Sequence, residues 1–518
     1  MNTPRPDPFY NRYNELAALE RAYQLPGNGG GMVLIYGRRR LGKTYLLQRF
    51  LTTGSDDSNR EKPHSYYLAE QTSAVLQRTS LAEQLIQAIP STGVHVEDIA
   101  GSWNALLRYV SAYGRTLEHG RERFGLVLDE FPYLMERNPE LPSVLQSWWD
   151  REGAHSRVFV VLCGSQLSTM ANLGTESKPL YGRFNAGIHQ LTPLSYHEVA
   201  MFYESSDYSL KEKLMLYGIL GGTPRYHALV NSKNPFADEI MNLFLCPIAA
   251  LENEVDYLLG SEQIRDPSTY NAILNMIAGG ATQFNVIQQK VGLEKASLPF
   301  YLKTLIELGW ITREVSFGDK TGKRALYKIN DPFLFFWHRF ITPLNSVRRF
   351  SDPRDLYNRR VMPYLDEYMG SYIFEDICKQ WLQSHCTTTL GIPLKNLQRY
   401  WSRDGNLEID LVGEIEDGSY LFGECKWSVN HPVGLSVYTD LKAKIAMLPE
   451  ERWRNTHNSI FFSVGGFTDS LRQLVKESDE RIILVDGAML LSGKGGNNTE
   501  SSGILPQRMY HMRGGKDV

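Results

Sequence analysis

Residues 37–44, GRRRLGKT, have the types and the spacing of a loop that binds phosphate groups. Gly37 and Gly42 allow backbone N–H groups to approach phosphate oxygens closely. Lys43 can reach the outer phosphates of a nucleotide, and the Thr44 hydroxyl can bind a magnesium ion. The chemistry that these residues predict is the binding of ATP together with Mg2+.

Two carboxylates, Asp129 and Glu130, could supply the rest of a hydrolytic site. They follow the apolar run 124–128, and a carboxylate at the carboxyl end of a parallel strand lies where ligands bind in open α/β sheets. Asp129 is therefore a candidate for the magnesium shell, and Glu130 for the general base that activates water. A plain polar turn is the alternative, but the position of the pair after a phosphate loop favours the catalytic interpretation.

Three further side chains could act on the phosphates. Ser165 follows the apolar run RVFVVLCG and could sense the terminal phosphate, or it could cap the next helix. Arg183, in KPLYGRFN, and Arg225, in GGTPRY, could neutralise charge on a transferring phosphoryl group, in many cases from a neighbouring subunit. The alternative for both arginines is a solvated surface position.

A second set of reactive residues lies in the segment DGNLEIDLVGEIEDGSYLFGECKWS. This segment predicts two strands joined by a turn at EDGS. Because side chains alternate along a strand, Glu424 and Lys426 share a face, and Asp410 on the preceding strand can face the same cavity. Two carboxylates and a lysine on one face are suited to magnesium-dependent hydrolysis of a phosphodiester.

The phosphate loop needs a strand before it and a helix after it. Residues 32–36 form a short apolar run, and KTYLLQRFL has the apolar spacing of a helix. With the apolar runs at 124–128 and 157–165, they predict an α/β domain with a parallel sheet.

The strings YGRRRLGKT, LVLDEFPYL, LCGS, PLYGR and GGTPRY, preceded by FYNRYNEL, occur in this order. Over residues 9–260 they resemble a prokaryotic ATPase family related to the AAA and STAND groups. The resemblance implies ATP hydrolysis. It matches Lys43 and Thr44 to the nucleotide and magnesium residues of the family, and Asp129 and Glu130 to its acidic motif.

Residues 270–328 predict a winged helix-turn-helix, with helices at 270–277, 284–290 and 297–308 and a hairpin around GDKTGK. The third helix offers few basic groups, mainly Lys295 and Lys303. The hairpin, or wing, carries more of them: Arg313, Lys320, Lys323, Arg324 and Lys328. This distribution favours contacts with DNA phosphates and low sequence specificity. A structural lid that packs on the ATPase core or mediates oligomer contacts is the alternative.

The segment around Asp410, Glu424 and Lys426 resembles the core of the PD-(D/E)XK nuclease superfamily. The resemblance matches these three residues to its motif positions, and Glu375, in GSYIFEDICKQWL, to the acidic residue of its first helix. Two alternatives stay open: an exposed ion pair of no catalytic use, and a core that keeps the fold without cleavage. Lys442 and Lys444, in YTDLKAKIAM, could contact phosphates or belong to a solvated helix face.

At 518 residues the chain is too long for one core. Its formal net charge of -3 gives no overall attraction to nucleic acid. Five cysteines without metal-ligand spacing, and no long apolar segment or signal core, predict a cytoplasmic protein without membrane contact. The expected parts are an ATPase core (1–195), a helical lid (196–262), a winged helix-turn-helix (263–330), a helical connector (331–365), a mixed α/β nuclease-like domain (366–491) and an unstructured tail (492–518).

The sequence thus predicts an ATP-hydrolysing protein that couples its nucleotide state to DNA binding and to metal-dependent cleavage. The alternative is an ATP-controlled signalling or scaffold protein with an inactive nuclease-like domain. An arginine that acts on a neighbouring subunit would require a homo-oligomer.

Overall fold

The computed structural model describes residues 11–24, 29–52, 61–90, 93–117, 122–262, 264, 266–454 and 458–492. They fall into two compact units. The first comprises residues 1–193, 223–228 and 256–265, and the second comprises residues 194–222, 229–255 and 266–518. The expected unstructured tail lies outside the described residues, except for Ser492.

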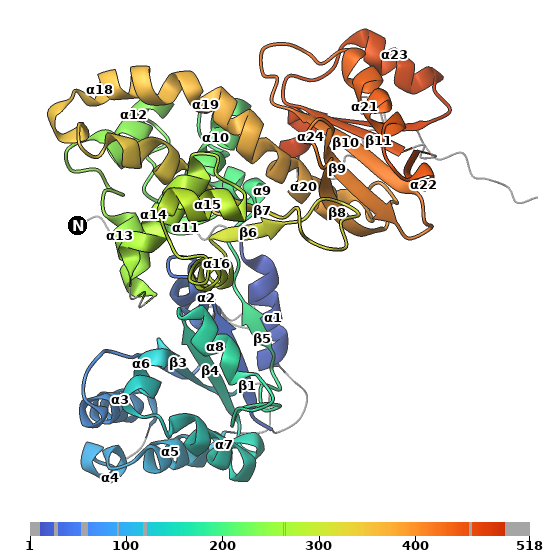
Figure 1. Cartoon of the computed structure of the whole chain (residues 1–518). Helices are drawn as coiled ribbons and strands as arrows, with labels where there is room; N and C mark the ends of the chain where they lie inside the picture. The colour runs from blue at the N-terminus through green and yellow to red at the C-terminus, as the bar shows by residue number, and fades with distance from the viewer. Residues whose placement is uncertain are drawn as a thin grey trace, which may run out of the picture. The chain divides into compact units, whose positions relative to one another are not determined.

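The first unit is built on a five-stranded sheet whose strands are all parallel, as the sequence predicts (Figure 1). The inner strands are almost wholly apolar because both faces of the sheet are covered. In the order in which they lie in the sheet, the strands are β2 (His64–Leu68), β3 (Phe124–Asp129), β4 (Val158–Gly164), β1 (Gly31–Tyr36) and β5 (Ile188–Gln190).

Helices cover the two faces of this sheet. On one face, α1 (Tyr13–Tyr23) and α2 (Lys43–Thr52) pack against Val33, Val127 and Val161. The alternate side chains of the same strands point to the other face. They are covered there by α3 (Ala74–Ala88), α5 (Trp103–Thr116), α6 (Phe131–Arg137), α7 (Leu141–Arg151) and α8 (Leu167–Leu173). The two cores hold the strands, while the loops after β1, β3 and β4 meet at the carboxyl edge of the sheet.

Most of the segment expected as a helical lid packs within the second unit. Its helices include α9 (Tyr196–Ala200), α10 (Leu210–Leu220) and α12 (Phe236–Ile240). The Tyr368 hydroxyl donates to the Gly218 carbonyl of α10 at 2.8 Å. A Cβ atom at Gly218 would lie 2.4 Å from the Met369 sulfur, so glycine permits this close packing. The short α11 (Pro224–His227) and residues 256–265 belong instead to the first unit.

Three helices and a hairpin occupy the region expected to be a winged helix-turn-helix. Gly292, at φ +73°, ends the middle helix in a left-handed conformation that glycine adopts without strain. The elements are α14 (Pro267–Ala278), α15 (Phe284–Val291), α16 (Leu298–Glu307) and the antiparallel strands β6 (Ile311–Glu314) and β7 (Leu326–Ile329).

A second five-stranded sheet lies near the end of the chain (Figure 1). It is mixed: β8, β9 and β10 are antiparallel, whereas β10, β11 and β12 are parallel. The strands are β8 (Leu394–Trp401), β9 (Glu408–Ile415), β10 (Tyr420–Lys426), β11 (Asn458–Ser463) and β12 (Arg481–Asp486).

Helices again cover both faces of this mixed sheet. On one face, α21 (Ser436–Ala446) and α23 (Asp469–Glu477) pack against Phe422 and Phe461. On the other face, Trp381 of α20 (Phe374–His385) meets Phe462, with ring centroids 5.6 Å apart.

All five cysteines are free thiols. Within the described part of the chain, no helix is both long and apolar enough to span a membrane.

Candidate functional site

The predicted phosphate loop connects β1 to α2 in the first unit. Gly42 has φ +87°, in the left-handed region, and a Cβ atom at Gly37 would lie 2.6 Å from the Leu191 carbonyl oxygen. Both positions therefore require glycine, one for backbone conformation and one for close approach. The Lys43 ammonium is buried and donates to the carbonyls of Gly37 and Arg38 at 2.7 and 3.1 Å. Burial lowers the pKa of Lys43.

The carboxylate of Asp129 joins the loop to the end of β3. The Thr44 hydroxyl donates to its Oδ2 at 2.9 Å, and the Glu130 backbone N–H donates to its Oδ1 at 2.9 Å. Asp129 is 1% exposed, so these bonds fix its orientation. Thr44 and Asp129 place two oxygen ligands side by side. This arrangement fits a Mg2+ ion that is held by few protein oxygens together with phosphates and water.

Tyr66 of β2 also bonds Asp129, a role that no local sequence pattern indicates. Its hydroxyl donates to Oδ2 at 2.5 Å. Burial and the negative charge of Asp129 raise the pKa of Tyr66. Tyr66 is therefore a neutral donor that positions the carboxylate.

Glu130 follows Asp129 in a left-handed conformation, with φ 51° and ψ 45°. Such a conformation is strained for a residue with a side chain and occurs frequently at functional sites. The Ser165 hydroxyl donates to the Glu130 carboxylate at 2.8 Å, and the Ser165 backbone N–H donates to it at 3.3 Å. Ser165 does not cap α8, whose N-cap residue is Gln166. The structure thus places Ser165 as a partner of Glu130.

The segment with Arg225 comes close to the phosphate loop. The buried guanidinium of Arg38 donates to the Thr223 hydroxyl at 2.9 Å, and Arg225 follows two residues later with an exposed side chain. Glu262 lies within electrostatic range of the loop. Burial raises its pKa to about 7, while Arg39, Arg38 and Lys43 oppose the shift.

Arg183 lies elsewhere in the first unit. Its guanidinium donates to the Asp150 carboxylate through two bonds of 2.8 Å. Two residues later, the Asn185 side chain bonds the backbone of Met32 and Gly30, where β1 begins. Arg183 therefore lies at the amino end of the sheet, whereas the phosphate loop lies at the carboxyl end.

The second predicted cluster lies on β9 and β10. The register pairs Gly423 with Leu411, so the next pair is Glu424 with Asp410. Asp410 accepts a hydrogen bond from the Cys425 backbone N–H at 2.8 Å. Glu424 is 3% exposed and accepts a bond from Lys426 at 2.7 Å. Burial, and then the charge of Glu424, raise the pKa of Asp410. The structure therefore brings Asp410, Glu424 and Lys426 together.

Glu375, on α20, is paired with Arg399 of β8 at 3.1 Å. Burial raises the pKa of Glu375 to about 7, against the opposing effect of Arg399. Arg399 also pairs with Glu314 of β6 and with Glu408 of β9. Across the described ranges, no group of three His, Cys, Asp or Glu side chains is arranged to hold a metal ion. Glu375 is thus engaged by Arg399, while Asp410 and Glu424 are the two carboxylates that lie side by side.

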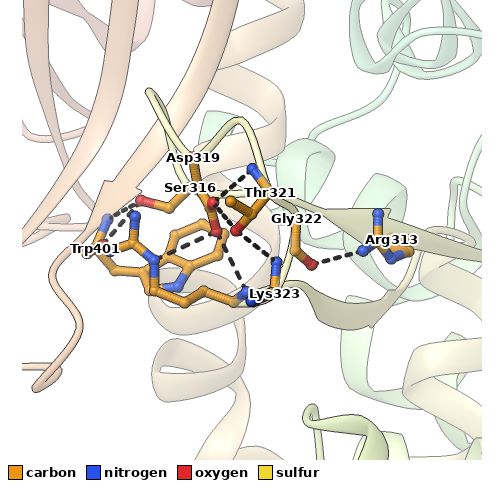
Figure 2. A network of polar contacts seen from close by, with 8 residues as sticks. Arg313, Ser316, Asp319, Thr321, Gly322, Lys323 and Trp401 are labelled. Carbon is orange, nitrogen blue, oxygen red and sulfur yellow. Dashed lines mark hydrogen bonds and ion pairs between the residues drawn. The ribbon is translucent and has the colours of Figure 1, made fainter.

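The wing packs on the mixed sheet, as Figure 2 shows in part. The Ser316 hydroxyl donates to the Trp401 carbonyl at 2.8 Å and accepts from the Trp401 N–H at 2.9 Å. Phe317 is buried against Tyr420 and Trp453, with ring centroids 6.0 and 5.3 Å away. At Gly318, a Cβ atom would lie 2.4 Å from the Trp453 ring. The wing is thus part of the core of this sheet.

Three of the basic groups of the wing have polar partners, two of them within the wing itself. Arg313 donates to the Gly322 carbonyl at 2.6 Å, Arg324 pairs with Asp319 at 3.3 Å, and Lys328 pairs with Asp376 at 2.7 Å. Lys320 and Lys323 have exposed side chains. Arg313 is exposed as well, so three of the five basic side chains of the wing are open to solvent.

Two segments of the chain match known families. Residues 9–230 match a family described as an ATPase domain predominantly from Archaea, and residues 337–435 match archaeal and bacterial proteins of unknown function. An uncharacterised protein of Methanocaldococcus jannaschii is 28% identical over 425 residues, covering 81% of this chain and 87% of that protein.

Two further proteins are similar to parts of the chain. An uncharacterised ATP-binding protein of the same organism is 46% identical over 43 residues, covering 8% of this chain and 70% of that protein. The solved structure of a Walker-type ATPase of Pyrococcus abyssi is 19% identical, with a TM-score of 0.49, and covers 65% of this chain and 98% of that one.

The family match covers the phosphate loop and the acidic end of β3, whose side chains meet at Asp129. The first unit is therefore a P-loop ATPase domain, similar to the family found predominantly in Archaea.

Proposed function

We propose that this protein hydrolyses ATP with Mg2+ at the phosphate loop and uses its nucleotide state to control DNA binding by the second unit. The bond of 2.9 Å between Thr44 and Asp129 carries this proposal, because it unites two motifs that are 85 residues apart. Thr44 and Asp129 would hold Mg2+, which would neutralise negative charge on the phosphates.

The residues of the chain have distinct roles in this proposal. Lys43 exchanges its bonds to the loop carbonyls for bonds to the outer phosphates. Glu130 accepts the proton of the attacking water, and Ser165 orients its carboxylate. Arg225 neutralises charge on the phosphates from the segment next to the loop. Arg183 acts from a neighbouring copy, because it lies at the amino end of its own sheet.

The DNA part of the proposal rests on the second unit. Lys320 and Lys323 are exposed on the wing and suit contacts with phosphates. Asp410, Glu424 and Lys426 form a cluster of the type that hydrolyses phosphodiesters when it holds a metal. The alternative is an ATP-controlled scaffold without cleavage, and the ion pairs that already occupy Glu424 favour it.

Cleavage of labelled single- and double-stranded DNA, with magnesium or manganese and with or without ATP, separates the two functions. The cleavage hypothesis predicts products that disappear in Asp410→Ala and change with ATP. Lys43→Ala should abolish ATP binding in either case. Unchanged ATP affinity in that variant would contradict the assignment of the phosphate loop as the ATP site. DNA that stays intact under every condition would exclude cleavage and support the scaffold function.

A further inference from the structure

Two lysines bind the same buried carboxylate in the mixed sheet. Lys426 donates to Oε2 of Glu424 at 2.7 Å, and Lys444 of α21 donates to Oε1 at 2.6 Å. Glu424 is 3% exposed, whereas the two lysine side chains are 43% and 28% exposed. Each oxygen of the carboxylate therefore accepts a hydrogen bond from an ammonium group, and both lysine side chains are partly exposed to solvent.

The charges of this cluster cancel. Asp410 and Glu424 are the two acidic groups, and Lys426 and Lys444 are the two basic groups. A divalent ion normally binds where carboxylate charge is in excess. Here Lys444 supplies positive charge at Oε1 of Glu424, an oxygen that a metal ion would need.

A polar group without a partner lies beside the cluster. Ser463 of β11 is in register with Lys426 on the neighbouring parallel strand, so both side chains point to the same face. The Ser463 hydroxyl is fully buried and has no hydrogen-bond partner among the described residues. It lies at the carboxyl ends of β10 and β11, which is the edge where parallel strands bind ligands. Buried hydroxyls are normally hydrogen-bonded, so Ser463 can bond a polar ligand that enters the cluster.

We propose that Lys444 is a built-in counter-cation that competes with a divalent metal ion for Glu424, and that the phosphate groups of DNA release Glu424 by drawing Lys444 away. The proposal rests on the proposed function, in that DNA is the source of the phosphates. Metal and DNA would then each raise the affinity of the other by the same factor, since coupling between two ligands is reciprocal. The cluster would hold metal chiefly when DNA is bound.

Mn2+ binding to the full chain, followed by the electron paramagnetic resonance signal of free Mn2+, tests this competition. The contribution of the cluster is the binding that Asp410→Asn removes. Lys444→Met should bind Mn2+ at the cluster at least about 10-fold more tightly than the wild type, which corresponds to about 1.4 kcal/mol. Lys444→Gln, which keeps a polar side chain without the charge, should behave in the same way.

Lys442→Met is the matched control. It removes a lysine from the same helix, but Lys442 pairs with Glu480 at 2.5 Å and not with Glu424. This variant should bind Mn2+ as the wild type does. Equal or weaker Mn2+ binding by both Lys444 variants would overturn the competition.

The role of phosphate needs a second arm of the experiment. A short duplex DNA should tighten Mn2+ binding by the wild type and leave Lys444→Met unchanged. Equal tightening in both proteins would overturn the role of DNA phosphate. These readouts are independent of strand cleavage, so a protein that never cuts DNA can still confirm the competition at Glu424.

Discussion

At the residue scale, the left-handed Glu130 and its bonds to Ser165 predict that Glu130 is needed for ATP turnover but not for ATP binding. Glu130→Gln should bind ATP normally, because the phosphate loop is intact, and its turnover should fall by about 10²–10⁴-fold, because a base is lost. Single-turnover hydrolysis and ATP titration on the same sample measure the two effects. Normal turnover would exclude Glu130 as the base.

Tyr66 gives a prediction about the magnesium requirement. Tyr66→Phe removes one hydrogen bond to Asp129, and bonds to charged groups contribute about 1.5–3 kcal/mol. The Mg2+ concentration for half-maximal ATPase activity should therefore rise by about 10-fold or more, with a smaller change in the maximal rate. Tyr67→Phe is the control, since Tyr67 packs in the core on the opposite face of the sheet. An unchanged Mg2+ dependence in Tyr66→Phe would show that Thr44 alone positions Asp129.

Glu262 predicts a dependence of stability on pH. Its pKa is raised to about 7 in the folded protein from an ordinary 4.5, mainly by burial. Between these values the folded state binds more protons than the unfolded state, so the free energy of unfolding falls as the pH rises through this window. Glu262→Gln should lose less thermal stability than the wild type between pH 5 and pH 8, as scanning calorimetry can measure. A parallel decline in both proteins would contradict the assignment.

At the element scale, the wing is a packing element of the mixed sheet. Phe317→Ala should destabilise the second unit by about 3–5 kcal/mol, the usual cost of truncating a buried phenylalanine. Phe350→Ala is the control, because Phe350 is 90% exposed and its loss should change stability by no more than about 0.5 kcal/mol. Urea unfolding of both variants measures the difference. Equal stability would show that the wing does not contribute to this core.

The elements also show what the sequence could predict. The strands and the roles of Lys43, Thr44 and Asp129 could be predicted, because a local motif and the geometry of a parallel sheet determine them. Contacts between distant segments could not be predicted. Tyr66 reaches Asp129 because β2 lies beside β3, and Lys444 reaches Glu424 because α21 packs over β10. The wing carried a clear hairpin pattern, but nothing local indicated that Phe317 enters the core of another sheet.

At the scale of the whole molecule, the formal net charge of -3 means that DNA binding depends on local groups. The double variant Lys320→Gln and Lys323→Gln should weaken DNA binding equally for different sequences. It should also reduce the slope of log affinity against log salt concentration by about 1.8, or 0.9 for each lost phosphate contact. Fluorescence anisotropy over a salt series measures the slope. A slope equal to that of the wild type would show that DNA does not contact these two lysines of the wing.

The burial of Phe317 also has a consequence during synthesis on the ribosome. Its core partners include Trp453, and β12, which completes the sheet, ends at Asp486. At about 5–20 residues per second, this part of the chain takes roughly 10–30 seconds to emerge after Phe317. During that time the hairpin exposes an aromatic side chain that has no core to enter. The nascent chain therefore needs either a chaperone or fast completion of its C-terminal strands.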